Sequence, residues 1–110
     1  YEPCGLDQLY CLRYGTIPVV RAVGGLEETI VEYDPASGKG TGFKFSTFDP
    51  EELWASIKRA LSLYSNPPAW EHVRRYAMQQ EFSWSQAAEN YLKIYEKARQ
   101  KRVDSEKRAL

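Results

Sequence analysis

The stretch EPCGLDQLYCLRYGTIPVVRAVGGLEETI, residues 2–30, decides the fold. Apolar residues at helical spacing begin after Gly5 and end at Gly15, and glycine at a helix end accepts a positive φ without strain. The β-branched run IPVVRA, residues 17–22, follows and is typical of a buried strand in a parallel sheet. Two glycines interrupt that strand, and residues 26–30 give about one helical turn. This order of helix, strand and helix predicts an α/β layered architecture.

Downstream, the composition alternates between turns and periodic segments. Residues 34–42 (DPASGKGTG) predict a loop, and residues 41–45 predict a short second strand. Asp49 or Thr47 is expected to cap a helix that stops at residues 66–68 (NPP). The predicted inner face of that helix is an apolar stripe of Leu53, Trp54, Ile57, Ala60, Leu61 and Tyr64.

Two more helices are expected before the end of the chain. The first spans residues 69–79, with Trp70, Val73 and Ala77 on one face. The second is capped by Ser83, and its expected inner face consists of Trp84, Ala87, Ala88, Tyr91, Tyr95 and Ala98. Charges crowd after residue 98, so we expect a frayed, solvated end there. We divide the chain into residues 1–66, which contain both expected strands, and residues 67–110, helices that pack on that part.

Composition excludes several classes of function. The chain has 110 residues, 43% of them hydrophobic, which suits a folded domain or part of one. Fifteen basic residues balance fifteen acidic ones, so nothing favours binding to nucleic acid. No apolar run is long enough to cross a membrane, and we expect a soluble chain with no membrane partner.

Cysteine and histidine content argues against a disulfide or a metal site. Cys4 and Cys11, if both lie on one helix, would be separated by roughly 10 Å along its axis. A disulfide tolerates at most about 7 Å between Cα atoms. His72 is the only histidine and no CxxC motif occurs, so we expect neither a metal nor another cofactor.

The segment Glu2-Pro3-Cys4-Gly5-Leu6 places a carboxylate in a tight turn just before a helix. The amides of a first helical turn lack partners within the helix, and together with the helix dipole they favour an anion such as a diphosphate. A neighbouring carboxylate can accept hydrogen bonds from the hydroxyls of a polyol. From the residues alone, an ordinary surface junction remains the simpler interpretation.

Residues 2–30 resemble the signature region of bacterial glycogen synthases and plant starch synthases. The likeness rests on EPCGL, followed by Gln8, residues 13–15 (RYG) and residues 24–26 (GGL). It continues more loosely through residues 41–43 (TGF), 49–50 (DP) and 82–84 (FSW), so it covers nearly the whole chain.

The resemblance implies the second half of a Rossmann-like domain, the C-terminal domain of the GT-B fold, rich in helices with few parallel strands. It also implies transfer of glucose from ADP-glucose to the non-reducing end of an α-1,4-glucan, with retention of configuration and no cofactor. The expected location is the bacterial cytoplasm, or the plastid in a plant.

The resemblance also assigns roles to residues. Glu2 would bind hydroxyls of the donor glucose and act as the catalytic residue. The backbone of Cys4, Gly5 and Leu6 would contact the sugar and the distal phosphate. The amides of Leu6 and Asp7 would stabilise the leaving diphosphate. Finally, Gly24 and Gly25 resemble a second glycine motif of the family, a close-packed turn beneath the cleft, and complete the expected substrate-binding set.

Two positions depart from related enzymes. Asp7 stands where many members carry Thr or Asn, and its charge would repel a diphosphate unless its side chain caps the helix. Tyr10 stands where many related retaining transferases carry a second glutamate, a difference shared by the synthases that contain EPCGL. Tyr10 therefore favours this family.

Other candidate residues have simpler interpretations. Arg21 either faces the cleft or forms a surface ion pair with Glu27 or Glu28. The tryptophans at positions 54, 70 and 84 lie on apolar stripes, so core packing is favoured over sugar stacking. Residues 38–41 (GKGT) lack the spacing of a phosphate-binding loop.

We expect these residues to be part of a longer enzyme, because the sequence opens inside a turn and the rest of a GT-B protein is missing. We predict that they transfer no detectable glucose alone. Two rival functions remain: a GT-B transferase that uses UDP-glucose or another acceptor, and a non-catalytic assembly fragment that forms homo-oligomers.

Overall fold

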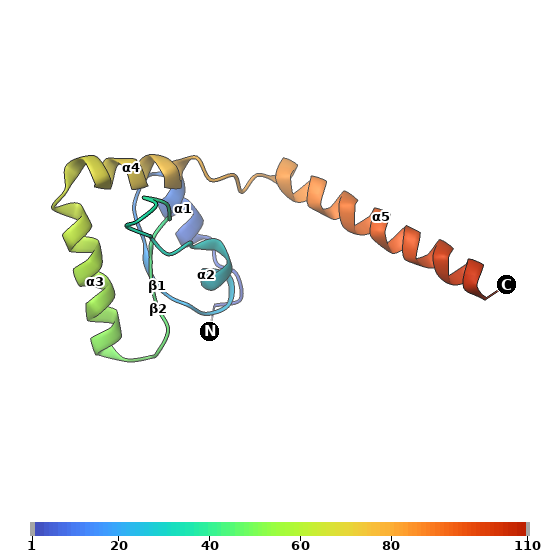
Figure 1. The fold of residues 1–110 in the computed structure, drawn as a ribbon, viewed down its shortest axis with the longest axis horizontal. Coiled ribbons are helices and arrows are strands. Elements are labelled where there is room, and N and C mark those ends of the chain that lie inside the picture. The colour runs from blue at the N-terminus through green and yellow to red at the C-terminus, as the bar shows by residue number, and fades with distance from the viewer. Residues whose placement is uncertain (1, 110) are drawn as a thin grey trace. The chain divides into compact units, whose positions relative to one another are not determined.

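The computed structural model describes residues 2–109 and contains five helices and two strands within that range. Their order is α1 (Asp7–Arg13), β1 (Val19–Arg21), α2 (Gly24–Thr29), β2 (Phe43–Phe45), α3 (Pro50–Tyr64), α4 (Pro67–Met78) and α5 (Trp84–Arg108) (Figure 1). The two strands are parallel, with Val19 opposite Phe43. The predicted α/β class, rich in helices with few parallel strands, is therefore confirmed.

The chain divides into two compact units, Tyr1–Gln80 and Glu81–Leu110. The first unit contains both strands and helices α1 to α4, so it extends past the boundary we placed at residue 66. The second unit contains α5. No helix in the described part of the chain is long and apolar enough to span a membrane.

The core of the first unit lies where α1, α2 and α4 meet the sheet. Leu12, Ile30 and Ala77 form a buried cluster, and Ile17 and Val20 pack against it. Each comes from a different segment, so the cluster ties both ends of the unit together. The predicted inner face of α4 is confirmed for Val73 and Ala77, which are 0% and 1% exposed.

Side chains cap the three long helices as their sequences indicate. The Asp49 carboxylate accepts a hydrogen bond from the Glu51 amide at the start of α3. Asn66 accepts one from Ala69 in α4, and Ser83 accepts one from Gln86 in α5. Each cap satisfies an amide that has no partner within its helix.

The expected inner face of α3 is wrong in part. Its buried residue is Ser56, whose hydroxyl donates to the Lys44 carbonyl at 2.9 Å, so a polar contact fastens α3 to β2. Residues two positions apart on a helix face different directions. Trp54 is consequently 54% exposed, and Leu53, Leu61 and Tyr64 are exposed as well.

The expectations for α5 are also wrong in part. No residue in this helix is buried within its own unit, and Trp84 is 88% exposed there. Nor does the helix fray after residue 98, because it continues to Arg108. Two side-chain pairs four residues apart, Gln100 with Asp104 and Arg102 with Glu106, support the charged end.

Candidate active site

The turn before α1 depends on Gly5 and Gln8. Gly5 has a φ of 74°, a left-handed conformation that residues with a side chain rarely adopt. The Gln8 side chain is buried, and its Nε2 donates to the Cys4 carbonyl at 2.6 Å. The first turn of the helix thus holds the turn that precedes it, and Glu2 folds back over Gly5.

Gly25 fixes the same turn from the other side. Its amide donates to the Glu2 carbonyl at 3.0 Å, and an added Cβ would lie 2.4 Å from the Cα and the carbonyl oxygen of Cys4. The two backbones are therefore in direct contact, which only glycine permits. Through this contact the N-terminus of α2 sets the position of Glu2.

A hollow of about 410 Å³ lies between α1 and β1, and we call it the α1 hollow. Of the predicted site residues, the structure brings Glu2, Gly5 and Asp7 together in its lining. Cys4, Leu6, Gly24 and Gly25 are not among its lining residues. Cys4 and Leu6 are exposed, whereas Gly25 is buried beneath the turn.

The start of α1 leaves its first amides available. Leu6 occupies the N-cap position, where no side chain of a described residue caps the helix. The exposed carboxylate of Asp7 is in the first helical turn and does not make the cap that would remove it from a bound anion. Asp7 therefore brings a negative charge to the α1 hollow.

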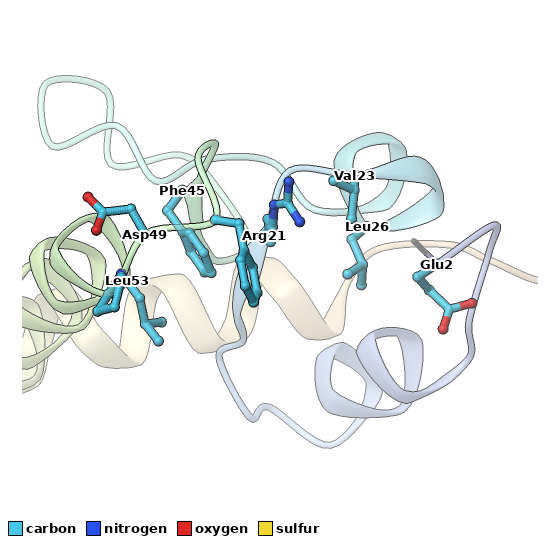
Figure 2. A pocket seen from close by; sticks show the side chains of 9 residues that line it. Glu2, Arg21, Val23, Leu26, Phe45, Asp49 and Leu53 are labelled. Atoms are coloured by element: carbon cyan, nitrogen blue, oxygen red, sulfur yellow. The ribbon is translucent and has the colours of Figure 1, made fainter.

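A second hollow, of about 470 Å³, lies where β1 and β2 end, and we call it the Phe48 hollow. Figure 2 shows Glu2 at one end of it, Asp49 and Leu53 at the other, and Phe45, Arg21 and Leu26 between them. Ligands of open α/β sheets bind outside the carboxyl ends of the strands, and this hollow lies at those ends.

Arg21 faces this hollow, which settles the two alternatives for it. Its Nε donates to the Ser46 carbonyl at 3.4 Å, and its guanidinium carbon lies 5.3 Å from the centre of the Phe48 ring. Glu27, one of the partners expected for Arg21, instead pairs with Lys44 at 3.1 Å.

The loop that carries Phe48 is held by Glu52. The Glu52 carboxylate accepts hydrogen bonds from the amides of Ser46 and Thr47 and from the Thr47 hydroxyl. These bonds, chiefly the one from the Thr47 amide, hold the pKa of Glu52 below its usual value. An exposed aromatic ring is thus presented by an ordered loop.

Relatives with known names match this chain along almost its whole length. It is 49% identical over 103 residues to the glycogen synthase of Koribacter versatilis and 50% identical over 102 residues to that of Desulforudis audaxviator. This chain is homologous to part of a glycogen synthase. The matches cover 94% and 92% of it but only 21% and 20% of the relatives, so the chain spans about a fifth of their length.

A solved structure agrees with the glycogen synthase resemblance. The catalytic domain of starch synthase IV from Arabidopsis thaliana, bound to ADP and acarbose, superposes with a TM-score of 0.74 and 31% identity. The superposition covers 88% of this chain and 20% of that one. No family model matches the chain. The resemblance to glycogen and starch synthases expected from EPCGL is confirmed.

Two features of the candidate site were not predicted from the sequence. Gln8 appeared only as part of the family signature, although a glutamine in the first turn after a glycine can reach back to the turn. No local signal marked Phe48, because its partner Arg21 is 27 positions earlier in the chain.

The cysteines and acidic side chains were also compared as a set within the described residues. Cys4 and Cys11 are free thiols, the first exposed and the second half-buried. Within residues 2–109, no three His, Cys, Asp or Glu side chains lie close enough together to hold a metal ion.

Proposed function

We propose that this chain supplies part of the donor-binding wall of a retaining glucosyltransferase that makes glycogen or starch. The enzyme transfers glucose from ADP-glucose to the non-reducing end of an α-1,4-glucan. The bond from the anomeric carbon to the diphosphate breaks, and a bond to an acceptor hydroxyl forms as that hydroxyl loses its proton. By the same resemblance, the enzyme works in the bacterial cytoplasm or the plastid.

The observation that carries the proposal is the position of Glu2 in the α1 hollow. Its carboxylate is half-buried beside the left-handed Gly5, and Gln8 and Gly25 hold the turn from both sides. A carboxylate on a turn held in this way can accept hydrogen bonds from the hydroxyls of a donor glucose. Fixing the turn in advance lowers the entropy lost when the sugar is positioned.

The free amides at the start of α1 suit the leaving diphosphate. The amides of Leu6 and Asp7 have no partner within the helix and point toward its N-terminal end. Charge that develops on the diphosphate would be stabilised by these donors, which act against the repulsion from the Asp7 carboxylate. Support for an adenine nucleotide comes from the starch synthase IV structure, which is bound to ADP, and its acarbose is a mimic of a glucan.

The proposal can be tested in a chimera in which this chain replaces the homologous segment of the Koribacter versatilis glycogen synthase. We expect Glu2→Ala and Glu2→Gln to lower kcat by about 10²- to 10³-fold, the loss typical of removing one preorganised catalytic contact. The measurement is glucose incorporation into glycogen from labelled ADP-glucose. As matched control, Glu28→Gln changes an exposed glutamate of α2 that lines neither hollow, and should keep full activity.

Two outcomes would overturn the proposal. A Glu2→Ala chimera with unchanged kcat would remove Glu2 from catalysis. Faster turnover of UDP-glucose than of ADP-glucose by the unmodified chimera would favour the alternative class of transferase.

A further inference from the structure

The Phe48 hollow has the size and lining of a ligand site. Its volume, about 470 Å³, lies within the range of roughly 300–1,000 Å³ common for small-molecule sites. Apolar side chains of Leu26, Phe45 and Leu53 form much of its wall. The expected functions of the turn and of α1 do not account for this hollow.

Phe48 presents an aromatic ring to the hollow. The residue is 86% exposed, which is unusual because phenylalanine is most often buried. The guanidinium carbon of Arg21 lies 5.3 Å from the centre of the ring. The loop is fixed because the amides of residues 46 and 47 donate hydrogen bonds to the Glu52 carboxylate. The ring is therefore available for stacking on a loop that is already ordered.

The charges in the hollow favour a neutral ligand. Two acidic residues, Glu2 and Asp49, are in the lining, together with the one basic residue Arg21. A phosphate would be repelled by this balance. A sugar ring fits it better, because its C–H face packs on an aromatic ring while its hydroxyls bind carboxylate and guanidinium groups.

The two hollows are adjacent, since Glu2 and Leu26 line both. If the donor glucose lies at Glu2 in the α1 hollow, an acceptor hydroxyl must reach the same sugar from a neighbouring space. On this basis, which rests on the proposed function, we propose that the Phe48 hollow binds the terminal glucose units of the acceptor glucan. Phe48 is then the stacking platform, and Arg21 binds hydroxyls.

The first test separates acceptor binding from donor binding in the chimera described above. Phe48→Ala should raise the KM for maltoheptaose about tenfold, which corresponds to 1.4 kcal/mol of lost binding. The KM for ADP-glucose should stay unchanged, and Phe48→Trp should restore the acceptor KM. Trp54→Ala removes another exposed aromatic side chain, on α3 and outside the hollow, and should leave both constants unchanged.

The second test uses the 110-residue chain itself. Maltoheptaose titrated into it should shift the NMR signals of Phe48 and Arg21, and Phe48→Ala should weaken the binding. Substitution of so exposed a side chain should leave folding intact.

The outcomes distinguish this inference from the proposed function. An active chimera whose acceptor KM is unaffected by Phe48→Ala overturns the acceptor site and leaves the function in place. An inactive chimera, together with a chain that binds maltoheptaose at Phe48, overturns the function and supports the site. Maltoheptaose shifts elsewhere on the chain, or none, also count against the site.

Discussion

Gly25 leaves no room for even a methyl group. Its Cβ would lie 2.4 Å from backbone atoms of Cys4, which cannot rotate away as a side chain can. We expect Gly25→Ala to push the Glu2 turn off α2 and to lower the free energy of unfolding by about 1–3 kcal/mol, as overpacking usually does. Urea denaturation of the chain measures this loss, and NMR should show shifted amide signals for residues 2–5.

Gly38→Ala is the control at the same scale. Gly38 also has a left-handed φ, of 69°, but the nearest atoms to its Cβ would be the His72 ring at 3.7 Å. Alanine there should cost about 1–2 kcal/mol through backbone strain alone. The signals of residues 2–5 should not move. Wild-type stability in Gly25→Ala would refute the account of the turn.

Single residues differ in how far their roles follow from sequence. A glycine just before a helical pattern indicates the turn at Gly5, and the resemblance points to Glu2. Gly25 contacts Cys4, which is 21 positions away in the sequence, and Arg21 contacts Phe48, which is 27 positions away. Such contacts depend on how α2 and the loop after β2 fold back, which no local pattern encodes.

At the scale of elements, Glu52 joins the start of α3 to the loop that carries Phe48. Because the fold lowers the pKa of Glu52, its stabilising bonds are complete above the ordinary pKa of about 4.3. They are lost as the pH falls through the lower value in the folded chain. We expect amide-exchange protection at Thr47 to be constant from pH 7 to pH 5 and to fall below about pH 4.

Two variants identify the group that titrates. Glu52→Gln cannot change charge, so the fall in Thr47 protection should disappear. Glu51→Gln removes the adjacent carboxylate, whereas the bonds from the loop go to Glu52. This variant should therefore keep the fall in Thr47 protection at low pH. If Glu52→Gln retained the wild-type pH profile, another group would hold the loop.

The features predicted correctly were those that a short stretch of sequence specifies. The caps Asp49 and Ser83 and the buried face of α4 agree with the sequence, because a cap or an apolar stripe is a local pattern. The inner face of α3 was wrong, since the buried Ser56 bonds to the Lys44 carbonyl. One polar contact with a strand thus outweighed an apolar stripe.

At the scale of the whole molecule, the buried core belongs to the first unit. The fully buried apolar side chains, Leu12, Ile30, Phe43, Val73 and Ala77, all precede residue 80. Periodicity predicted α5 as a helix with an inner face, yet it cannot say whether a partner surface exists. The homologous relatives are about five times longer than this chain, so their other segments lie beyond any inference from these residues.

The location of the buried apolar side chains predicts that the first unit folds without α5. A chain ending at Gln80 should lose less than about 1 kcal/mol of stability, equivalent to a fall in Tm of roughly 4–8 °C at most for a unit of this size. The reason is that the buried core cluster consists of side chains of the first unit alone. Thermal unfolding followed by circular dichroism compares the two chains, and hydrogen exchange in the full chain should be faster in α5 than in α4. A fall in Tm well above 8 °C, or slow exchange throughout α5, would mean that this helix contributes to the folding of the first unit.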